Sequence, residues 1–342
     1  MSKKAKIILF AVGIVIFIYL VNDFGLNNIF INLKKTGWYL IPVIGVWAFV
    51  YLCNAFAWRF VIGDDSKKIS FGKILSITIS GFSLNYLTPS ISLGGEPYRI
   101  AELRKPLGMS KAVSSTFLYS MIHFLSSFVF WILIILLALV SLVITSATKI
   151  SLIITLIVFF VIVYFFINRH KNGIVESLLN LITRIPFVKT LASKYSDKVE
   201  SVRKVDEQIK DLYLNRKADF FSALSLEILA RTIASLENLF ILKAIGIDIT
   251  FSQALYITAF SSFVINLFFF MPLELGSREG GLVLVLKTLK ISSSLGIYIG
   301  LVNRIRELLW ILIGLILIVS GKKKMTKELT AKEKEYEKSV VV

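Results

Sequence analysis

Two polar clusters interrupt long apolar stretches of this sequence and carry side chains suited to binding an anion. Guanidinium groups match the geometry of phosphate through paired hydrogen bonds. A charge at the centre of a membrane helix costs about 2.5–3.5 kcal/mol, so one that persists there faces a partner, a cavity or a substrate. The pattern predicts an anion-binding site made of Asn85, Glu96, Arg99, Asn266, Arg278, Glu279 and Arg304.

A structural role for the same charges is the alternative. Glu96 would pair with Arg99, and Arg278 would pair with Glu279 or with Arg304, only to hold the chain in shape. Elsewhere, Glu227 and Arg231 are four residues apart, and we expect them to pair within their own helix.

Both clusters contain residues that break a helix. The breaks are Pro89, Gly94 and Gly95 in the first cluster, and Pro272 and Gly276 in the second. Lipid does not tolerate the unpaired backbone groups left by such breaks, so these segments persist only inside protein or along a wet cavity. Broken helices at corresponding places in two halves of a membrane protein point to a substrate site near the bilayer midplane, with helix N-termini facing an anion.

The elements that must position these clusters are membrane helices. The chain has 342 residues, 56% of them hydrophobic, and a mean hydropathy of +0.77. Apolar runs of about 20 residues suffice to cross a bilayer core of about 30 Å. We expect full spans at 7–22, 39–62, 112–144, 150–168, 219–247 and 293–320. The first of these resembles an uncleaved signal anchor, because no small-residue cleavage site follows it.

The basic residues suggest the orientation. The segment 169–217, the N-terminal lysines and the tail from Lys322 are all rich in basic residues, which favours the cytoplasmic side. They share that side only if 71–110 enters from the cytoplasm and returns, and 251–291 enters from the exterior and returns. We therefore expect an all-α polytopic membrane protein with six spans and two opposed re-entrant hairpins, arranged as an inverted repeat. Eight apolar helical segments are the alternative.

We expect one integral membrane domain over 1–321. Its first half, 1–168, and second half, 218–321, are joined by a cytoplasmic amphipathic linker at 169–217. The charged tail, 322–342, is expected to be a frayed helix or disordered.

Several function classes find no support in the sequence. The net charge of +17 fits anionic lipid better than nucleic acid, because little soluble surface remains. Cys53 is the single cysteine, so no disulfide can form within the chain. His123 has no second histidine or carboxylate at metal-ligand spacing and is expected to be a hydrogen-bonded core imidazole. We expect no metal, no cofactor and no nucleotide-binding or catalytic motif.

The clusters resemble those of the lysylphosphatidylglycerol synthase transmembrane-domain family, also called flippase-like integral membrane proteins. The resemblance rests on Pro272 to Glu279 with Leu301 to Gly314, and on Asn85, Pro89, Gly94, Gly95 and Arg99. The sequence departs from the family pattern at Leu273–Leu275 and at Tyr119–Phe124. The resemblance implies a stand-alone form without the aminoacyl-transferring domain of the longer synthases.

The expected function is to bind an anionic phospholipid or lipid-linked headgroup and move it between leaflets of the cell membrane, with both termini cytoplasmic. The alternative is a membrane enzyme, or a subunit working with a separately encoded transferase, that modifies a lipid or polyprenyl phosphate. Glu96 and Glu279 would then be its acid/base groups. A third possibility is a structural protein that docks a cytosolic partner on 169–217.

Overall fold

The computed structural model describes residues 26–88, 94–142, 144–169, 207–208, 210–269, 274 and 276–340. The expected first span at 7–22, nearly all of the 169–217 linker, and the breaks Pro89 and Pro272 lie outside the described residues.

The described residues form helices and no strand, as expected for an all-α polytopic membrane protein. The first half contains α2 (Leu26–Thr36), η1 (Gly37–Tyr39), α3 (Leu40–Ile62), η2 (Gly63–Lys68), α4 (Phe71–Leu87), α5 (Gly95–Leu107), α6 (Met109–Ser141) and α7 (Ser146–Arg169). The second half contains α11 (Lys217–Ala234), α12 (Leu236–Lys243), α13 (Phe251–Leu267), α14 (Ser277–Thr288) and α15 (Leu295–Val340).

Three of the described helical stretches are long and apolar enough to cross a membrane. They are Lys34–Lys68, Met109–Ser141 and Ser146–Phe165, and they contain or overlap the expected spans at 39–62, 112–144 and 150–168. Ile154, Ile157 and Val161 on α7 are exposed in the isolated chain, as befits side chains that face lipid.

Two expected spans look different in the structure. The run 219–247 is divided at Ser235 into α11 and α12. The run 293–320 belongs to α15, which carries the buried charges Arg304, Arg306 and Glu307 and continues as one helix through the tail to Val340. The tail is therefore helical and continuous with the last apolar segment.

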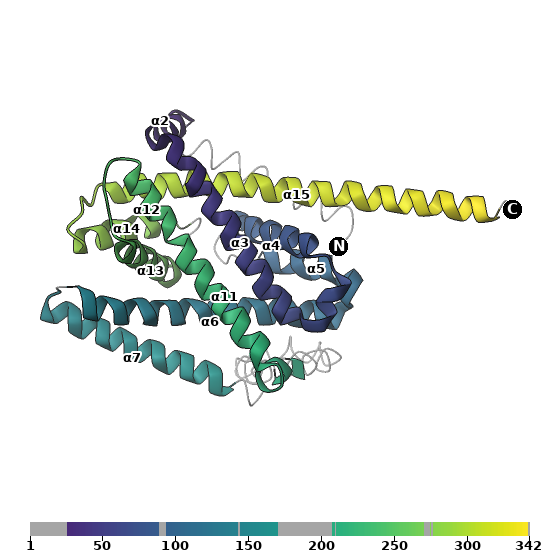
Figure 1. Cartoon of the computed structure of the whole chain (residues 1–342), viewed down its shortest axis with the longest axis horizontal. Helices are drawn as coiled ribbons and strands as arrows, with labels where there is room; N and C mark the ends of the chain where they lie inside the picture. Colours follow the sequence, from purple (N-terminus) through teal and green to yellow (C-terminus); the bar gives the residue numbers. More distant parts are fainter. Residues whose placement is uncertain are drawn as a thin grey trace, which may run out of the picture.

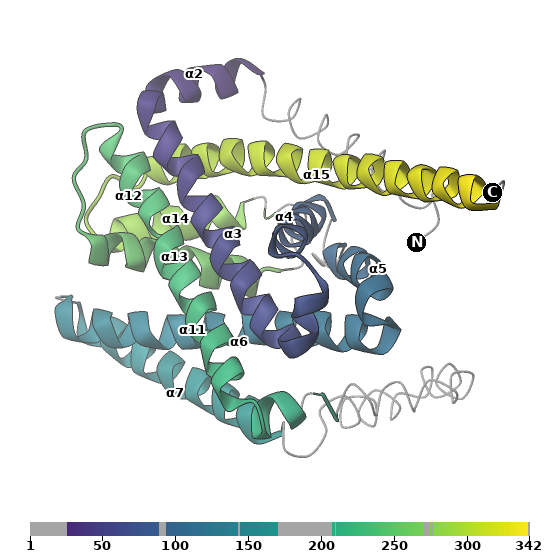
Figure 2. The ribbon, with the colours of Figure 1, turned by 45° about the vertical axis from the view of Figure 1, so that its right-hand side comes forward.

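Helices α3 and α11 cross the centre of the assembly side by side and antiparallel. Asn54 of α3 contacts Glu227 of α11, and Arg216, just before α11, donates to the carbonyl of Phe60 at 2.6 Å. Helix α15 runs along one side of this pair, and α6 with α7 runs along the other (Figure 1 and Figure 2). The tail end of α15 extends beyond the other helices (Figure 1).

The two interrupted segments are helical hairpins. Helix α4 packs against α5, and α13 packs against α14. The two ends of the first hairpin lie together, since Lys73 and Glu102 form an ion pair of 2.5 Å. At the base of the second hairpin, Ile247 and Ile249 belong to the same apolar cluster as Leu289. Each hairpin therefore returns to the end from which it started.

One helix of each hairpin packs antiparallel to α15: α4 of the first hairpin and α14 of the second. The two helices contact different parts of α15. Ser80 and Ser83 of α4 donate to the carbonyls of Gly314 and Trp310, each at 3.1 Å. Helix α14 instead packs on the N-terminal part of α15. Its Arg278 reaches Glu307 at 2.6 Å. The tips of the two hairpins thus approach the same turn of α15 from opposite ends.

The contacts between helices repeat in the two halves. Helix α5 packs on α6 as α14 packs on α15, and α4 packs on α15 as α13 packs on α6. Helix α3 contacts α4 in the way that α12 contacts α13. This correspondence between halves is the arrangement that an internal repeat produces.

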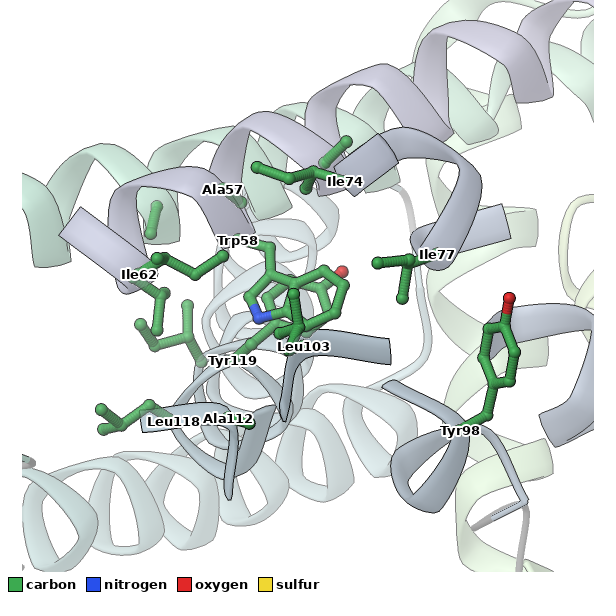
Figure 3. Close-up of a cluster of buried hydrophobic side chains, with 14 of the residues drawn as sticks. Ala57, Trp58, Ile62, Ile74, Ile77, Tyr98, Leu103, Ala112, Leu118 and Tyr119 are labelled. Atoms are coloured by element: carbon green, nitrogen blue, oxygen red, sulfur yellow. The ribbon is translucent and has the colours of Figure 1, made fainter. Parts of the chain in front are cut away.

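The largest apolar core lies under the first hairpin. Trp58 of α3 stacks on Tyr119 of α6 with ring centroids 5.5 Å apart (Figure 3). Ile74, Ile77 and Leu103 are fully buried around these rings. In lipid such packing stabilises by close contact rather than by exclusion of water, so it fixes where the first hairpin sits.

Candidate headgroup-binding site

Asn85 links the two helices of the first hairpin at its tip. Its Oδ1 accepts the backbone N–H of Gly95 at 2.6 Å, and its Nδ2 donates to Glu96 Oε1 at 3.3 Å. A side chain at the end of α4 thereby caps the start of α5. Gly95 must be glycine, because an added Cβ would lie 2.2 Å from the carbonyl oxygen of Gly81.

Arg99 lies one turn inside α5 and is only 2% exposed. Its Nη1 reaches Glu96 Oε1 at 3.4 Å, which is a weak contact. Its Nε and Nη2 find no partner among the described residues. The guanidinium carbon lies 4.7 Å from the ring of Phe82, and the rings of Trp58 and Tyr119 complete an aromatic enclosure. Cation–π contacts offset part of the burial cost, but they leave strong donors unused.

The tip of the second hairpin is built around Gly276, which has φ +78 and is the N-cap residue of α14. Glu279 Oε2 accepts the Gly276 N–H at 3.0 Å. Asn266 does not play the part that Asn85 plays in the first hairpin, because its Nδ2 donates to Ser262 within α13 and the residue is exposed. Glu279 holds this turn instead.

Ion pairs tie the second tip to α15. Arg304 Nε and Nη2 both donate to Glu279 Oε1, at 2.9 and 2.8 Å. Arg278 pairs with Glu307 and also with Glu274. Of the two pairings considered for Arg278, neither forms, whereas Glu279 with Arg304 and Glu96 with Arg99 are present.

The pairing extends across α12 to α3. Arg306 Nε donates to Glu237 Oε1 at 3.0 Å, and Trp47 Nε1 donates to Glu237 Oε2 at 2.7 Å. The Arg306 guanidinium lies 3.7 Å over the Trp47 ring. Sequence reasoning did not place Glu237, Glu274 or Trp47 at the site. The signal that could have found Glu237 is its position as a carboxylate inside the apolar run 219–247.

Tyr86 lies near the end of α4, within electrostatic range of Glu307 on α15 and of Arg278 and Glu274 in the second hairpin. The end of α4 therefore lies near the charges of the second tip, whereas Asn266 is exposed.

Most of the sequence matches the model of one protein family. Residues 6–315 match the model of the lysylphosphatidylglycerol synthase transmembrane region. The chain belongs to this family. No curated protein and no solved structure gives a significant match. As a member of the lysylphosphatidylglycerol synthase transmembrane family, the chain is a membrane protein associated with lipid and related to lipid modification or translocation.

In this family member, the charges at the two tips are balanced differently. Around the second tip, the guanidiniums lie among at least as many carboxylates, namely Arg278, Arg304 and Arg306 with Glu237, Glu274, Glu279 and Glu307. At the first tip, the one ion pair that Arg99 forms among the described residues is a long contact of 3.4 Å with Glu96. Arg99 is therefore the guanidinium best able to accept an additional anion.

Proposed function

We propose that the protein binds the phosphate of an anionic phospholipid or lipid-linked headgroup between the hairpin tips and moves it between leaflets. The observation that carries the proposal is Arg99, buried beside the start of α5 with two nitrogen atoms that have no hydrogen-bond partner among the described residues. A phosphate oxygen would satisfy these donors, and the N-terminus of α5 adds partial positive charge. Asn85 and Glu96 keep the guanidinium and the helix start together.

We further propose that both hairpins are re-entrant. Their bases lie toward opposite ends of α15, which supports entry from opposite faces of one bilayer. In that placement the interrupted backbone at both tips lies within protein at membrane depth, where it is tolerated. The termini would be cytoplasmic in the cell membrane.

The second tip would open and close the site. Arg278 and Arg304 hold α14 against α15 through Glu307 and Glu279. A phosphate that binds one of these guanidiniums would displace the carboxylate paired with that guanidinium. Loss of the ion pair would weaken the packing of α14 on α15. Exchange of ion-pair partners would thus couple headgroup binding to hairpin movement.

The test is redistribution of a fluorescent anionic phospholipid between the leaflets of reconstituted vesicles. We expect Arg99→Gln to slow it about 10- to 100-fold, because a hydrogen bond to a charged group contributes about 1.5–3 kcal/mol. Arg59→Gln, which removes an exposed cation near the end of α3, is the matched control and should behave as the unmodified protein.

Folded Arg99→Gln protein with an unchanged rate would contradict the proposal. Formation of a new lipid species by the purified protein, given lipid and candidate donors, would instead favour the enzymatic alternative.

A further inference from the structure

A second buried polar cluster lies where α3, α6 and α11 meet. Glu227 of α11 is 0% exposed. Its Oε2 lies 2.6 Å from His123 Nδ1 on α6, and its Oε1 accepts from Asn54 Nδ2 on α3 at 2.8 Å. His123 is thus hydrogen-bonded, as expected, but its partner is a carboxylate on another helix. An imidazole in contact with a buried carboxylate inside membrane helices is typical of proton relays.

Arg231 supports this pair without replacing it. The expected hydrogen-bonded pair with Glu227 within α11 is not the arrangement found, because Arg231 donates to Ser126 Oγ at 2.9 Å and to the His123 carbonyl at 2.7 Å. It still lies within electrostatic range of Glu227. Arg231 therefore lies close enough to balance a negative charge on Glu227.

We propose that His123 and Glu227 form a proton-binding site that couples proton movement to lipid translocation; this inference rests on the proposed function. Neutral His123 donates its Nδ1–H to Glu227, which leaves Nε2 to accept a proton from water. The His123 side chain is 37% exposed, whereas that of Glu227 is closed off, so the proton arrives at the imidazole. Protonation converts the cluster from neutral to positive, and release restores it.

The rings of Phe82 and Tyr119 each lie next to both His123 and Arg99. Phe82 of α4 lies 5.5 Å from the His123 ring and 4.7 Å from the Arg99 guanidinium. The two cations are therefore at most about 10 Å apart, and at an effective dielectric constant of about 20 a charge at His123 changes anion affinity at Arg99 by roughly tenfold. Protonation makes the region more positive, so proton and phosphate favour each other's binding.

Other titratable or charged groups face the pair from the surrounding helices. Tyr119 lies beside His123 on α6, Cys53 on α3 is within electrostatic range of Glu227, and Arg99 approaches from α5. Phenol, thiol and guanidinium groups ordinarily titrate above about pH 8. Imidazole is the side chain whose ordinary pKa lies near the physiological range, so we assign the proton to His123.

The first experiment observes the proton directly. The sequence contains two histidines, so His170→Gln leaves one imidazole, and nitrogen NMR of histidine-labelled full-length protein in micelles reports only His123. We expect this signal to titrate, with its midpoint moved to lower pH by at least one unit in Glu227→Gln. Short-chain phosphatidylglycerol should move the midpoint to higher pH, and Arg99→Gln should abolish that second shift.

An imidazole signal that stays constant between pH 4 and pH 9 would overturn the proton site. So would an identical midpoint in the unmodified protein and in Glu227→Gln. If Glu227→Gln does not fold, Asn54→Ala changes a neutral partner of the same carboxylate, and an effect of phosphatidylglycerol on the unmodified protein remains decisive.

The second experiment separates this inference from the proposed function. In vesicles with an imposed pH gradient, lipid redistribution should follow the gradient in the unmodified protein and lose that dependence in His123→Asn. Redistribution that ignores the gradient would refute the coupling and leave the proposed function intact. No redistribution under any condition would refute the proposed function, while the NMR titration would still decide whether His123 and Glu227 bind the proton.

Discussion

Glu96 and Arg99 pair within one helix, whereas Arg278 also pairs with a carboxylate on another helix. Glu96 and Arg99 are three apart in one helix, so their shared face follows from helical geometry. Arg278 finds its carboxylate on Glu307, in another helix. That pairing depends on how α14 packs on α15, which no short stretch of sequence encodes.

The close approach of α4 and α5 gives a residue-scale prediction. Gly95→Ala places a methyl group 2.2 Å from the Gly81 carbonyl oxygen, so the first tip must spread. We expect a loss of about 1–3 kcal/mol in the free energy of unfolding, as for other overpacked sites. Detergent-denaturant titration in mixed micelles measures it.

Gly72→Ala provides the matched control in the same hairpin. A Cβ at Gly72 meets nothing within 4 Å, so stability should be unchanged or raised by up to about 1 kcal/mol, since alanine favours the helix. Equal losses in the two variants would mean that the close approach at Gly95 does not hold the hairpin.

At the scale of elements, α4 ends at Leu87 and α14 begins at Ser277, next to the proline and glycine residues from which the sequence predicted helix breaks. The division of α11 from α12 was not predicted. Ser235 donates its hydroxyl to the carbonyl of Thr232 at 2.6 Å, a local bond that competes with regular helix geometry. A serine in an apolar run is a weak signal by itself.

The pair joining α14 to α15 gives an element-scale prediction. Arg304→Glu leaves Glu279 facing a like charge, and Glu279→Arg leaves Arg304 in the same position. We expect each single change to lower stability by about 2–4 kcal/mol, because a mostly buried charge loses its partner. The thermal unfolding midpoint of the purified protein is the measurement.

The double variant Glu279→Arg with Arg304→Glu restores opposite charges. It should recover more than half of the lost stability, which a double-mutant cycle quantifies. Additive losses in the double variant would show that the two side chains do not interact.

At the scale of the whole molecule, composition alone predicted a polytopic helical membrane protein, and the family match agrees. The paired breaks led to the prediction of an inverted repeat, and the helices of the two halves make corresponding contacts. The packing of the first hairpin on α15 was not predicted, because it arises from contacts between residues 234 and 227 positions apart.

The re-entrant arrangement predicts which surfaces share a side of the membrane. In a Cys53→Ala background, single cysteines at Lys67 and Lys105 should react with an impermeant thiol reagent from one side, and a cysteine at Lys287 from the other. Lys67 and Lys105 flank the first hairpin, and Lys287 lies near the base of the second. All three positions are exposed.

Labelling of intact and inverted membrane vesicles measures the sides. If α4 and α5 together crossed the bilayer, Lys67 and Lys105 would react from opposite sides. That result would rule out re-entry of the first hairpin while leaving the ion pairs of the second tip unaffected.

Helix α15 is a single continuous rod that touches one hairpin near Gly314 and the other near Glu307. Rotation of this rod about its long axis would sweep both sets of contacts at the same time. Both hairpins therefore contact the same helix, and a partner that rotated the projecting C-terminal end of α15 would move the two tips at the same time.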